Sequence, residues 1–283
     1  MKKYKLLKYS LVTLIMLFLQ FLKPLYLLAG SGNTNKNYVN IHQDSSYLYI
    51  DANGIPNHET GQFPGKGNPH AISEQNYHFK VIKNPQFADQ NTIISNNNVG
   101  VALNGIPFDP GTAECYGKRQ GRGHGYCQWR YEAIVSGSKK LGLDNSNAHV
   151  QPNGAYHYHG IPTKLLPFLE QQGDIIHVGY AADGFRIFVS KSNSYKPSYV
   201  LKHGTRSIGG EYDGTFTQDF EYSAGSGNLD ECNGIEISGE YAYFVTDRFP
   251  FVPRCLKGNP DKSFFHNSGD HHHKKSYQDG NEK

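Results

Sequence analysis

Short runs of apolar and aromatic residues, each ended by Gly, Pro or Asn, recur along the chain after residue 31. Most of these runs contain β-branched or aromatic side chains, which pack well on the pleated surface of a sheet. Gly, Pro and Asn favour the turns between strands. The pattern predicts strands at Tyr47–Ile50, Tyr77–Ile82, Val99–Leu103, Ala155–His159, Ile175–Ala181, Phe185–Val189 and Tyr241–Thr246.

Only two segments have a helical pattern, Trp129–Leu141 and Thr163–Gln171. Thr163 is a suitable N-cap for the second, but Pro167 disfavours the middle of a helix. Gly-Ile-Pro occurs at 54–56, 105–107 and 160–162, and we interpret all three as turns that end strands. The fold class expected from these patterns is mainly β: a single β-rich domain, sandwich- or barrel-like, with one or two short helices.

The two ends of the chain differ from its middle. Residues 1–30 begin with four lysines and no acid, continue with the apolar run LVTLIMLFLQFL and end in small residues, as secretory signal peptides do. The run is shorter than the roughly 20 residues of a membrane span, and the alternative is an uncleaved anchor. Residues 31–257 are then the β-rich domain. Residues 258–283 are polar, include His271–His273, and are expected to form a disordered His-rich tail.

Charge narrows the possible partners. The chain has 28 Lys and Arg against 25 Asp and Glu, a net charge of +3. Five of the lysines lie in residues 1–30, so the remainder has 23 basic and 25 acidic residues, a net charge of −2. No basic patch argues for nucleic acid. We expect membrane contact only through the N-terminal signal or anchor, and the sequence identifies no other partner.

The four cysteines are Cys115, Cys127, Cys232 and Cys255. An even number in an exported chain favours two disulfides, for which three pairings are possible. Cys115–Cys127 and Cys232–Cys255 each close a short loop and are the pairings we expect. A thiolate metal site is the alternative, although no C-x-x-C spacing occurs. Export would place the protein in the periplasm, at the cell surface or outside the cell.

The stretch NAHVQPNGAYHYHG holds the densest group of the 14 histidines. On a strand, His157 and His159 point to the same side with Cα atoms about 6.5–7 Å apart, which lets two imidazoles share an ion. Pro152, Asn153 and Gly154 predict a turn, so a hairpin can return His149 beside the pair. Three neutral imidazoles suit zinc or copper, and iron or nickel are possible.

An oxygen atom can complete such a site. Asp183 is the candidate ligand, and Asp230 or Glu231 is a candidate second ligand, partner of a histidine, or general base. Aspartates before glycine are also common turn formers, and a histidine cluster can be purely structural, so both readings stay open. His58 and His70 lie in a Gly/Pro-rich loop that is expected to be exposed or to cover the site, and His124 lies between Cys115 and Cys127.

AHVQPNGAYHYHG resembles the signature of the YHYH domain family, which consists of exported and poorly characterised, mostly bacterial proteins. Four further blocks agree with the resemblance: NGIPNHETGQFPGKGNPHAISEQNYHF, GVALNGIPFDPGTAE, VGYAADGFRIF and LDECNG. Together they cover roughly Ile50 to Leu256. The resemblance implies that Tyr156, His157, Tyr158 and His159 belong to a defining motif, and it brings no established reaction.

Three functions remain compatible with the sequence, and whether the protein is an enzyme stays open. The first is an exported protein that binds or handles a transition metal through His149, His157 and His159. The second is a metal-dependent hydrolase or other enzyme, in which the metal activates a water molecule for attack on a small polar molecule or glycan. The third is a metal-free module that binds carbohydrate or peptide on its aromatic residues. No G-x-S-x-G, Walker or H-E-x-x-H motif is present.

Overall fold

The computed structural model describes residues 36–94, 97–117, 127–135, 141–171 and 173–265. The predicted signal peptide, His124 and most of the predicted tail lie outside these residues. Strands dominate the described part, which confirms the expected β class. Within the same ranges, no helix has both the length and the apolar character needed to span a membrane.

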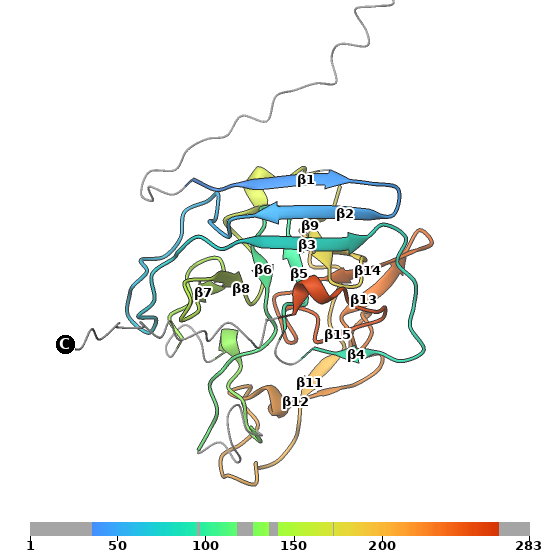
Figure 1. Cartoon of the computed structure of the whole chain (residues 1–283). Helices are drawn as coiled ribbons and strands as arrows, with labels where there is room; N and C mark the ends of the chain where they lie inside the picture. Colours follow the sequence, from blue (N-terminus) through green and yellow to red (C-terminus); the bar gives the residue numbers. More distant parts are fainter. Residues whose placement is uncertain (1–35, 95–96, 118–126, 136–140, 172, 266–283) are drawn as a thin grey trace, which may run out of the picture. The chain divides into compact units, whose positions relative to one another are not determined.

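In the described part of the chain, fifteen strands form four sheets. Figure 1 shows their arrangement. They are β1 Val39–Gln43, β2 Tyr47–Ala52, β3 Tyr77–Ile82, β4 Thr92–Ile93, β5 Gly100–Ala102, β6 Pro107–Phe108, β7 Ala148–Val150, β8 Tyr156–Tyr158, β9 Ile175–Ala181, β10 Arg186–Ser190, β11 Tyr199–Leu201, β12 Phe220–Tyr222, β13 Gly234–Ile237, β14 Glu240–Phe244 and β15 Cys255–Leu256. All seven predicted strands are present, and the short or exposed strands such as β1, β4 and β15 are those that the pattern missed.

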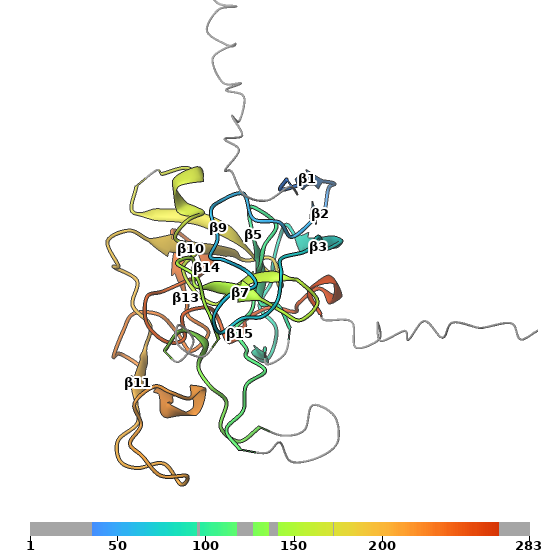
Figure 2. The same cartoon turned by 90° about the vertical axis from the view of Figure 1, so that its left-hand side faces the viewer.

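The largest sheet has eight strands in the order β13-β14-β10-β9-β5-β6-β8-β7. Most neighbours are antiparallel, whereas β10 with β14 and β6 with β8 are parallel. β13 and β7 lie at opposite ends of the order, so the sheet does not close into a barrel. The hairpin of β7 and β8 therefore forms one edge of the sheet, and β7 faces the viewer in Figure 2.

Burial along the central strands follows their apolar pattern. In β9, Ile176 and Val178 are buried to 2% exposure or less, and Val101 on β5 and Ile187 on β10 are fully buried. Gly179 is required in β9 because a Cβ atom there would lie 2.2 Å from the carbonyl oxygen of Val101. This close approach brings β9 against β5, and a larger residue would force the two strands apart.

A second, antiparallel sheet has the order β1-β2-β3. Its inner face carries Ile50 and Phe79, which belong to the main core, and its outer face carries Tyr47, Tyr49 and Asp51. The alternation of side chains along β2 explains this division, because neighbouring residues of a strand point to opposite faces.

Helical structure is scarcer than the sequence pattern predicts. Of Thr163–Gln171, only Leu166–Phe168 is helical, as the 3-10 helix η1. Pro167 explains its shortness, because proline cannot donate the backbone hydrogen bond that a longer helix needs. Of Trp129–Leu141, Ala133–Val135 are helical, Trp129 to Glu132 are not, and residues 136–140 lie outside the described residues. The two other short helices are η2 Thr217–Asp219 and η3 Lys262–Phe264.

The boundary predicted at residue 258 needs correction. Residues 258–265 are ordered, contain η3, and bury the side chain of Phe264 completely. The Phe264 ring lies 4.8 Å from the ring of Phe79 on β3. The polar composition GNPDKS concealed this segment, because one buried aromatic side chain gives no periodic pattern in a sequence. Residues 266–283 lie outside the described part of the chain.

Both predicted disulfides are present, Cys115–Cys127 and Cys232–Cys255, and the chain has no free cysteine. Pairs of this kind are typical of proteins that fold in an oxidising compartment. The three Gly-Ile-Pro segments each follow a strand, β2, β5 and β8 respectively, and so act as strand-ending turns.

Candidate metal centre

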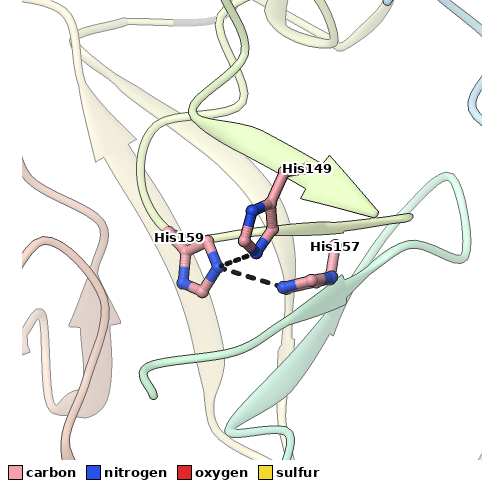
Figure 3. Close-up of side chains that lie close together, drawn as sticks. All are labelled: His149, His157 and His159. Atoms are coloured by element: carbon pink, nitrogen blue, oxygen red, sulfur yellow. Dashed lines mark hydrogen bonds between the residues drawn. The ribbon is translucent and has the colours of Figure 1, made fainter. Parts of the chain in front are cut away.

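The β7–β8 hairpin brings His149, His157 and His159 together (Figure 3). His149 on β7 lies directly opposite His157 on β8. The turn between the strands closes with a hydrogen bond from the Gln151 amide to the Ala155 carbonyl, and Gly154 has a φ of 87°. The predicted hairpin is thus confirmed, and with it the return of His149 to the pair.

Alternation along β8 separates the histidines from the tyrosines. Tyr156 and Tyr158 are fully buried on the face opposite the histidines. The Tyr156 hydroxyl donates to Asp144 at 2.7 Å, and the Tyr158 hydroxyl contacts the Nε2 atom of His58 at 2.6 Å. The tyrosines therefore hold the strand from behind, while the histidines face a common point.

The three imidazoles converge through their Nε2 atoms. His159 Nε2 lies 3.0 Å from His157 Nε2 and 3.1 Å from His149 Nε2. All three ligand atoms lie within 4.8 Å of one another. A tetrahedral zinc ion, about 2.0–2.1 Å from each nitrogen, keeps its ligands about 3.3 Å apart. The two separations that involve His159 are close to that value, and the third lies within 4.8 Å.

Backbone carbonyls fix the tautomers of two of the rings. The Nδ1 atom of His149 lies 2.8 Å from the carbonyl oxygen of Leu141, and the Nδ1 atom of His157 lies 3.1 Å from that of Ala155. A carbonyl oxygen only accepts, so each Nδ1 carries the ring proton and each Nε2 presents a lone pair. Metal-binding histidines are usually held in this way, with the other ring nitrogen donating to a carbonyl or carboxylate.

Burial favours the neutral form of His149 and His159. His157 and His159 are 3% and 2% exposed, whereas His149 is half-buried, so the site opens toward solvent on the side of His149. Desolvation lowers the pKa of His149, and lowers that of His159 far below its ordinary value with help from its two neighbours. A neutral imidazole is the form that binds a metal.

Hydrogen bonds among the three rings cannot satisfy all three facing Nε2 atoms. The Nε2 atoms of His149 and His157 carry lone pairs, so a proton on His159 Nε2 can satisfy only one of the two short contacts. The other contact then places two lone pairs about 3 Å apart in a buried site, which is repulsive. A cation between the three nitrogens removes this repulsion. The Nδ1 atom of His159 has no partner of good hydrogen-bond geometry, although the backbone of Asp109 is close enough to raise the pKa of the ring slightly.

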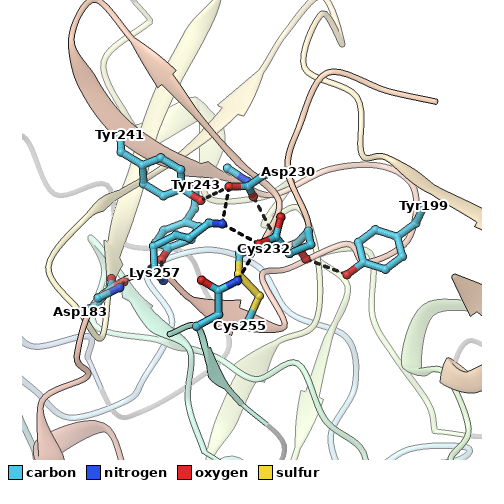
Figure 4. The surroundings of a disulfide bond; sticks show 12 residues. Asp183, Tyr199, Asp230, Cys232, Tyr241, Tyr243, Cys255 and Lys257 are labelled. Carbon is cyan, nitrogen blue, oxygen red and sulfur yellow. Dashed lines mark hydrogen bonds and ion pairs between the residues drawn. A yellow bond between two sulfur atoms is a disulfide. The ribbon is translucent and has the colours of Figure 1, made fainter. Parts of the chain in front are cut away.

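Asp183 is not part of this group, which corrects its expected role as a ligand. Its carboxylate is 1% exposed, and its Oδ2 atom accepts hydrogen bonds from the Tyr243 hydroxyl at 2.7 Å and the Gly258 amide at 2.9 Å (Figure 4). Burial raises the pKa of Asp183, and these hydrogen bonds partly offset the rise. Asp183 thus anchors the chain at Gly258 and has its acceptor positions in use.

Asp230 and Glu231 also lie outside the histidine group, beside the Cys232–Cys255 disulfide (Figure 4). Lys257 Nζ bridges them, at 3.2 Å from Asp230 Oδ2 and 2.7 Å from Glu231 Oε1. The hydrogen bond from Lys257 is the largest cause of a lowered pKa at Glu231. Neither residue contacts the histidines as a base or hydrogen-bond partner in this arrangement.

The other loop histidines divide between the two faces of β8. His58 lies on the tyrosine face, with its ring stacked on Tyr158 at 5.9 Å. His70 lies close enough to His149 to lower the pKa of that ring through charge repulsion. Of the two residues expected to cover the site or to be exposed, only His70 is therefore near the histidine group.

His177 on β9 is a half-buried histidine outside the group. Its Nε2 atom donates to the Gly179 carbonyl at 2.9 Å, and desolvation lowers its pKa to about 4. The folded state therefore binds fewer protons than the unfolded state between pH 6.5 and 4. Above pH 6.5 the protonation of His177 does not lower the free energy of unfolding. As the pH falls from 6.5 toward 4, the unfolded state gains a proton that the folded state does not, and the free energy of unfolding falls by about 1.4 kcal/mol per pH unit.

The variant His177→Gln keeps a hydrogen-bond donor on this side chain but cannot take up the proton. When the pH is lowered from 7 to 4.5, we expect its free energy of unfolding to fall by about 2–3 kcal/mol less than that of wild type. Urea unfolding at the two pH values measures the difference. Equal losses in the two proteins would show that His177 does not contribute to acid sensitivity.

Some residues that shape the site could not be found by reading motifs. Asp144 accepts hydrogen bonds from the Tyr156 hydroxyl and from the amides of Gly61, Ser146 and Ala148, and so fixes the loop that enters β7. The Asp-Asn-Ser-Asn sequence suggests a turn but does not indicate its partners. The Leu141 carbonyl has no sequence signature, because every residue has one.

Comparison with known proteins gives one result. The model of a family described as YHYH protein matches residues 78–258, which is more than half of the chain. The match includes the β7–β8 hairpin with all three histidines, and it begins after β2. No curated protein and no solved structure matches the chain.

Proposed function

The chain belongs to the YHYH protein family, and we propose that it is an exported protein that binds a transition metal ion through His149, His157 and His159. Its role would be metal binding or handling at the cell envelope. One observation carries the proposal: three Nε2 atoms converge while backbone carbonyls hold the Nδ1 protons of two of the rings.

The donor set favours zinc or copper as the ion. Three neutral imidazoles suit either metal, and iron or nickel would bind by the same atoms. Export is supported by the two disulfides and by the signal-like composition of residues 1–30. An ion in this site would be reached from the side of His149, which is the ring that solvent contacts.

Metal handling is favoured over hydrolysis by the positions of the carboxylates. A hydrolase of the kind considered needs a base beside the metal-bound water. Within the described residues, the converging group contains only histidines, while Asp183, Asp230 and Glu231 form hydrogen bonds elsewhere. A metal-free role is disfavoured because it predicts no convergence of the ring nitrogens, whereas here three Nε2 atoms face one another.

Metal content tests the proposal directly. The full-length chain, purified without a tag and dialysed against a weak chelator after exposure to zinc or copper, is analysed by mass spectrometry beside the double variant His157→Ala with His159→Ala. We expect wild type to hold about one equivalent more metal than the double variant. The tail histidines are the same in both proteins, so the difference reports the hairpin site.

The matched control is His177→Ala, which removes a half-buried strand histidine outside the group. It should retain the metal content of wild type. Equal metal in wild type and the double variant would contradict the proposal, and the cluster would then be a structural element.

A further inference from the structure

A groove lies near the β13–β14 end of the eight-stranded sheet, whereas the histidines lie at its β7 end. The groove has no role in the proposed function. Its lining residues come from the end of the three-stranded sheet, from β10 and from the β13–β14 hairpin. Its volume is about 510 Å³, and a second hollow of about 350 Å³ adjoins it, sharing Phe87 and Tyr241. Volumes of this size accommodate a small molecule or a few units of a chain.

Phe87 divides the two hollows and is unusually exposed for its size. Its side chain is 64% exposed, yet it packs against Phe185 in a stacked arrangement at 5.5 Å and against Tyr241 edge-on at 5.3 Å. Because one face is packed and held, the other face is presented to solvent as a fixed apolar platform. A ligand with an apolar face can therefore stack on Phe87 without displacing any protein group.

The groups around this platform are polar and their charges balance. In the larger hollow, Lys83 and Arg186 are matched by Glu236 and Glu240. In the smaller hollow, Lys257 is matched by Asp230. A strongly charged ligand would therefore meet as much repulsion as attraction. A neutral ligand is the type that this charge distribution fits.

Besides Tyr180 and Tyr241, the remaining polar lining includes several side-chain amides. Gln43, Asn84 and Gln86 line the larger hollow and Asn91 lines the smaller one. An amide both donates and accepts hydrogen bonds, as a hydroxyl does. Amides around an exposed aromatic face match the chemistry of a sugar ring, which has hydroxyls at its edge and C–H groups on its faces.

We propose that this groove binds a neutral oligosaccharide, with one sugar stacked on Phe87 and its neighbours in the hollows on either side. The site lies on different elements from the histidine hairpin. Binding should therefore be independent of metal.

Calorimetric titration of the full-length chain tests the inference. The probes are the neutral trisaccharides cellotriose, maltotriose and chitotriose, the anionic trigalacturonate, and the tripeptide Gly-Tyr-Gly. We expect at least one neutral trisaccharide to bind, Phe87→Ala to weaken it at least tenfold, and Phe87→Trp to retain it, since an indole supplies the same platform. Phe168→Ala is the matched control, because Phe168 is a 45% exposed phenylalanine on η1 outside the groove, and it should bind as wild type does.

Three results would overturn the inference. They are no binding of any neutral trisaccharide, binding that Phe87→Ala leaves unchanged, and preferential binding of trigalacturonate or the tripeptide. Because Phe87 is largely exposed, the alanine variant should fold, and circular dichroism of each variant checks this.

Discussion

Zinc at a hundredfold excess over its dissociation constant should raise the melting temperature of the wild-type protein by about 5–10 °C, and His157→Ala should abolish the rise. An ion that binds only the folded state at this excess stabilises it by about 2.7 kcal/mol. In a domain of about 150–250 residues, each kcal/mol moves the melting temperature by about 2–4 °C. The site exists only when the β7–β8 hairpin pairs His149 with His157, so binding and folding are coupled.

The measurement is a thermal scan of chelator-treated protein with and without zinc, repeated with copper. His177→Ala is again the control and should show the full shift from a lower starting temperature. The tail histidines lie outside the described structure and are present in every variant. An equal shift in wild type and His157→Ala would show that the stabilising ion binds elsewhere.

Phe264→Ala should destabilise the protein by about 3–5 kcal/mol, which is the usual cost of truncating a fully buried phenylalanine. The segment that carries Phe264 is also held by its backbone. The Ser263 hydroxyl accepts from the Lys80 amide at 2.9 Å, and the Asp261 amide donates to the Ala182 carbonyl at 2.8 Å. The segment therefore cannot easily move inward to fill the cavity that removal of the ring leaves.

Urea unfolding followed by circular dichroism gives the change in unfolding free energy. The neighbouring Phe265, which is 39% exposed, provides the control, and Phe265→Ala should cost less than about 1 kcal/mol. If Phe264→Ala remained within 1 kcal/mol of wild type, residues 258–265 would not be part of the folded domain. A chain shortened at Lys257 would lose Phe264 and should be destabilised for the same reason.

Local patterns predicted the part of the site that depends on neighbouring residues. Alternation along a strand placed His157 and His159 on one face, and Pro152-Asn153-Gly154 predicted the turn that returns His149. These features depend on the backbone geometry of about a dozen consecutive residues, and that geometry can be predicted from the residues themselves. The same holds for the disulfides, since Cys115–Cys127 and Cys232–Cys255 close short loops.

The position of the carboxylates was not predictable in this way. Asp183 was expected at the metal, but Tyr243 and Gly258, which are 60 and 75 residues away in sequence, hold it elsewhere. A turn with an aspartate before glycine looks the same in a sequence whichever partner the carboxylate finds. The choice depends on which strands pair, and here β9, β10 and β14 pair side by side.

By itself, the sequence determined the β class, seven of the strands, both disulfides, the family and the three converging histidines, because each follows from local periodicity, loop length or a motif. Only the tertiary structure decided that the Leu141 and Ala155 carbonyls orient two of the rings, that Asp183 and Lys257 serve the disulfide region, and that Phe87 stands exposed between two hollows. Phe264 in the core is a further case. These contacts join segments far apart in the chain, and their energies depend on burial and packing that exist only after the strands have assembled.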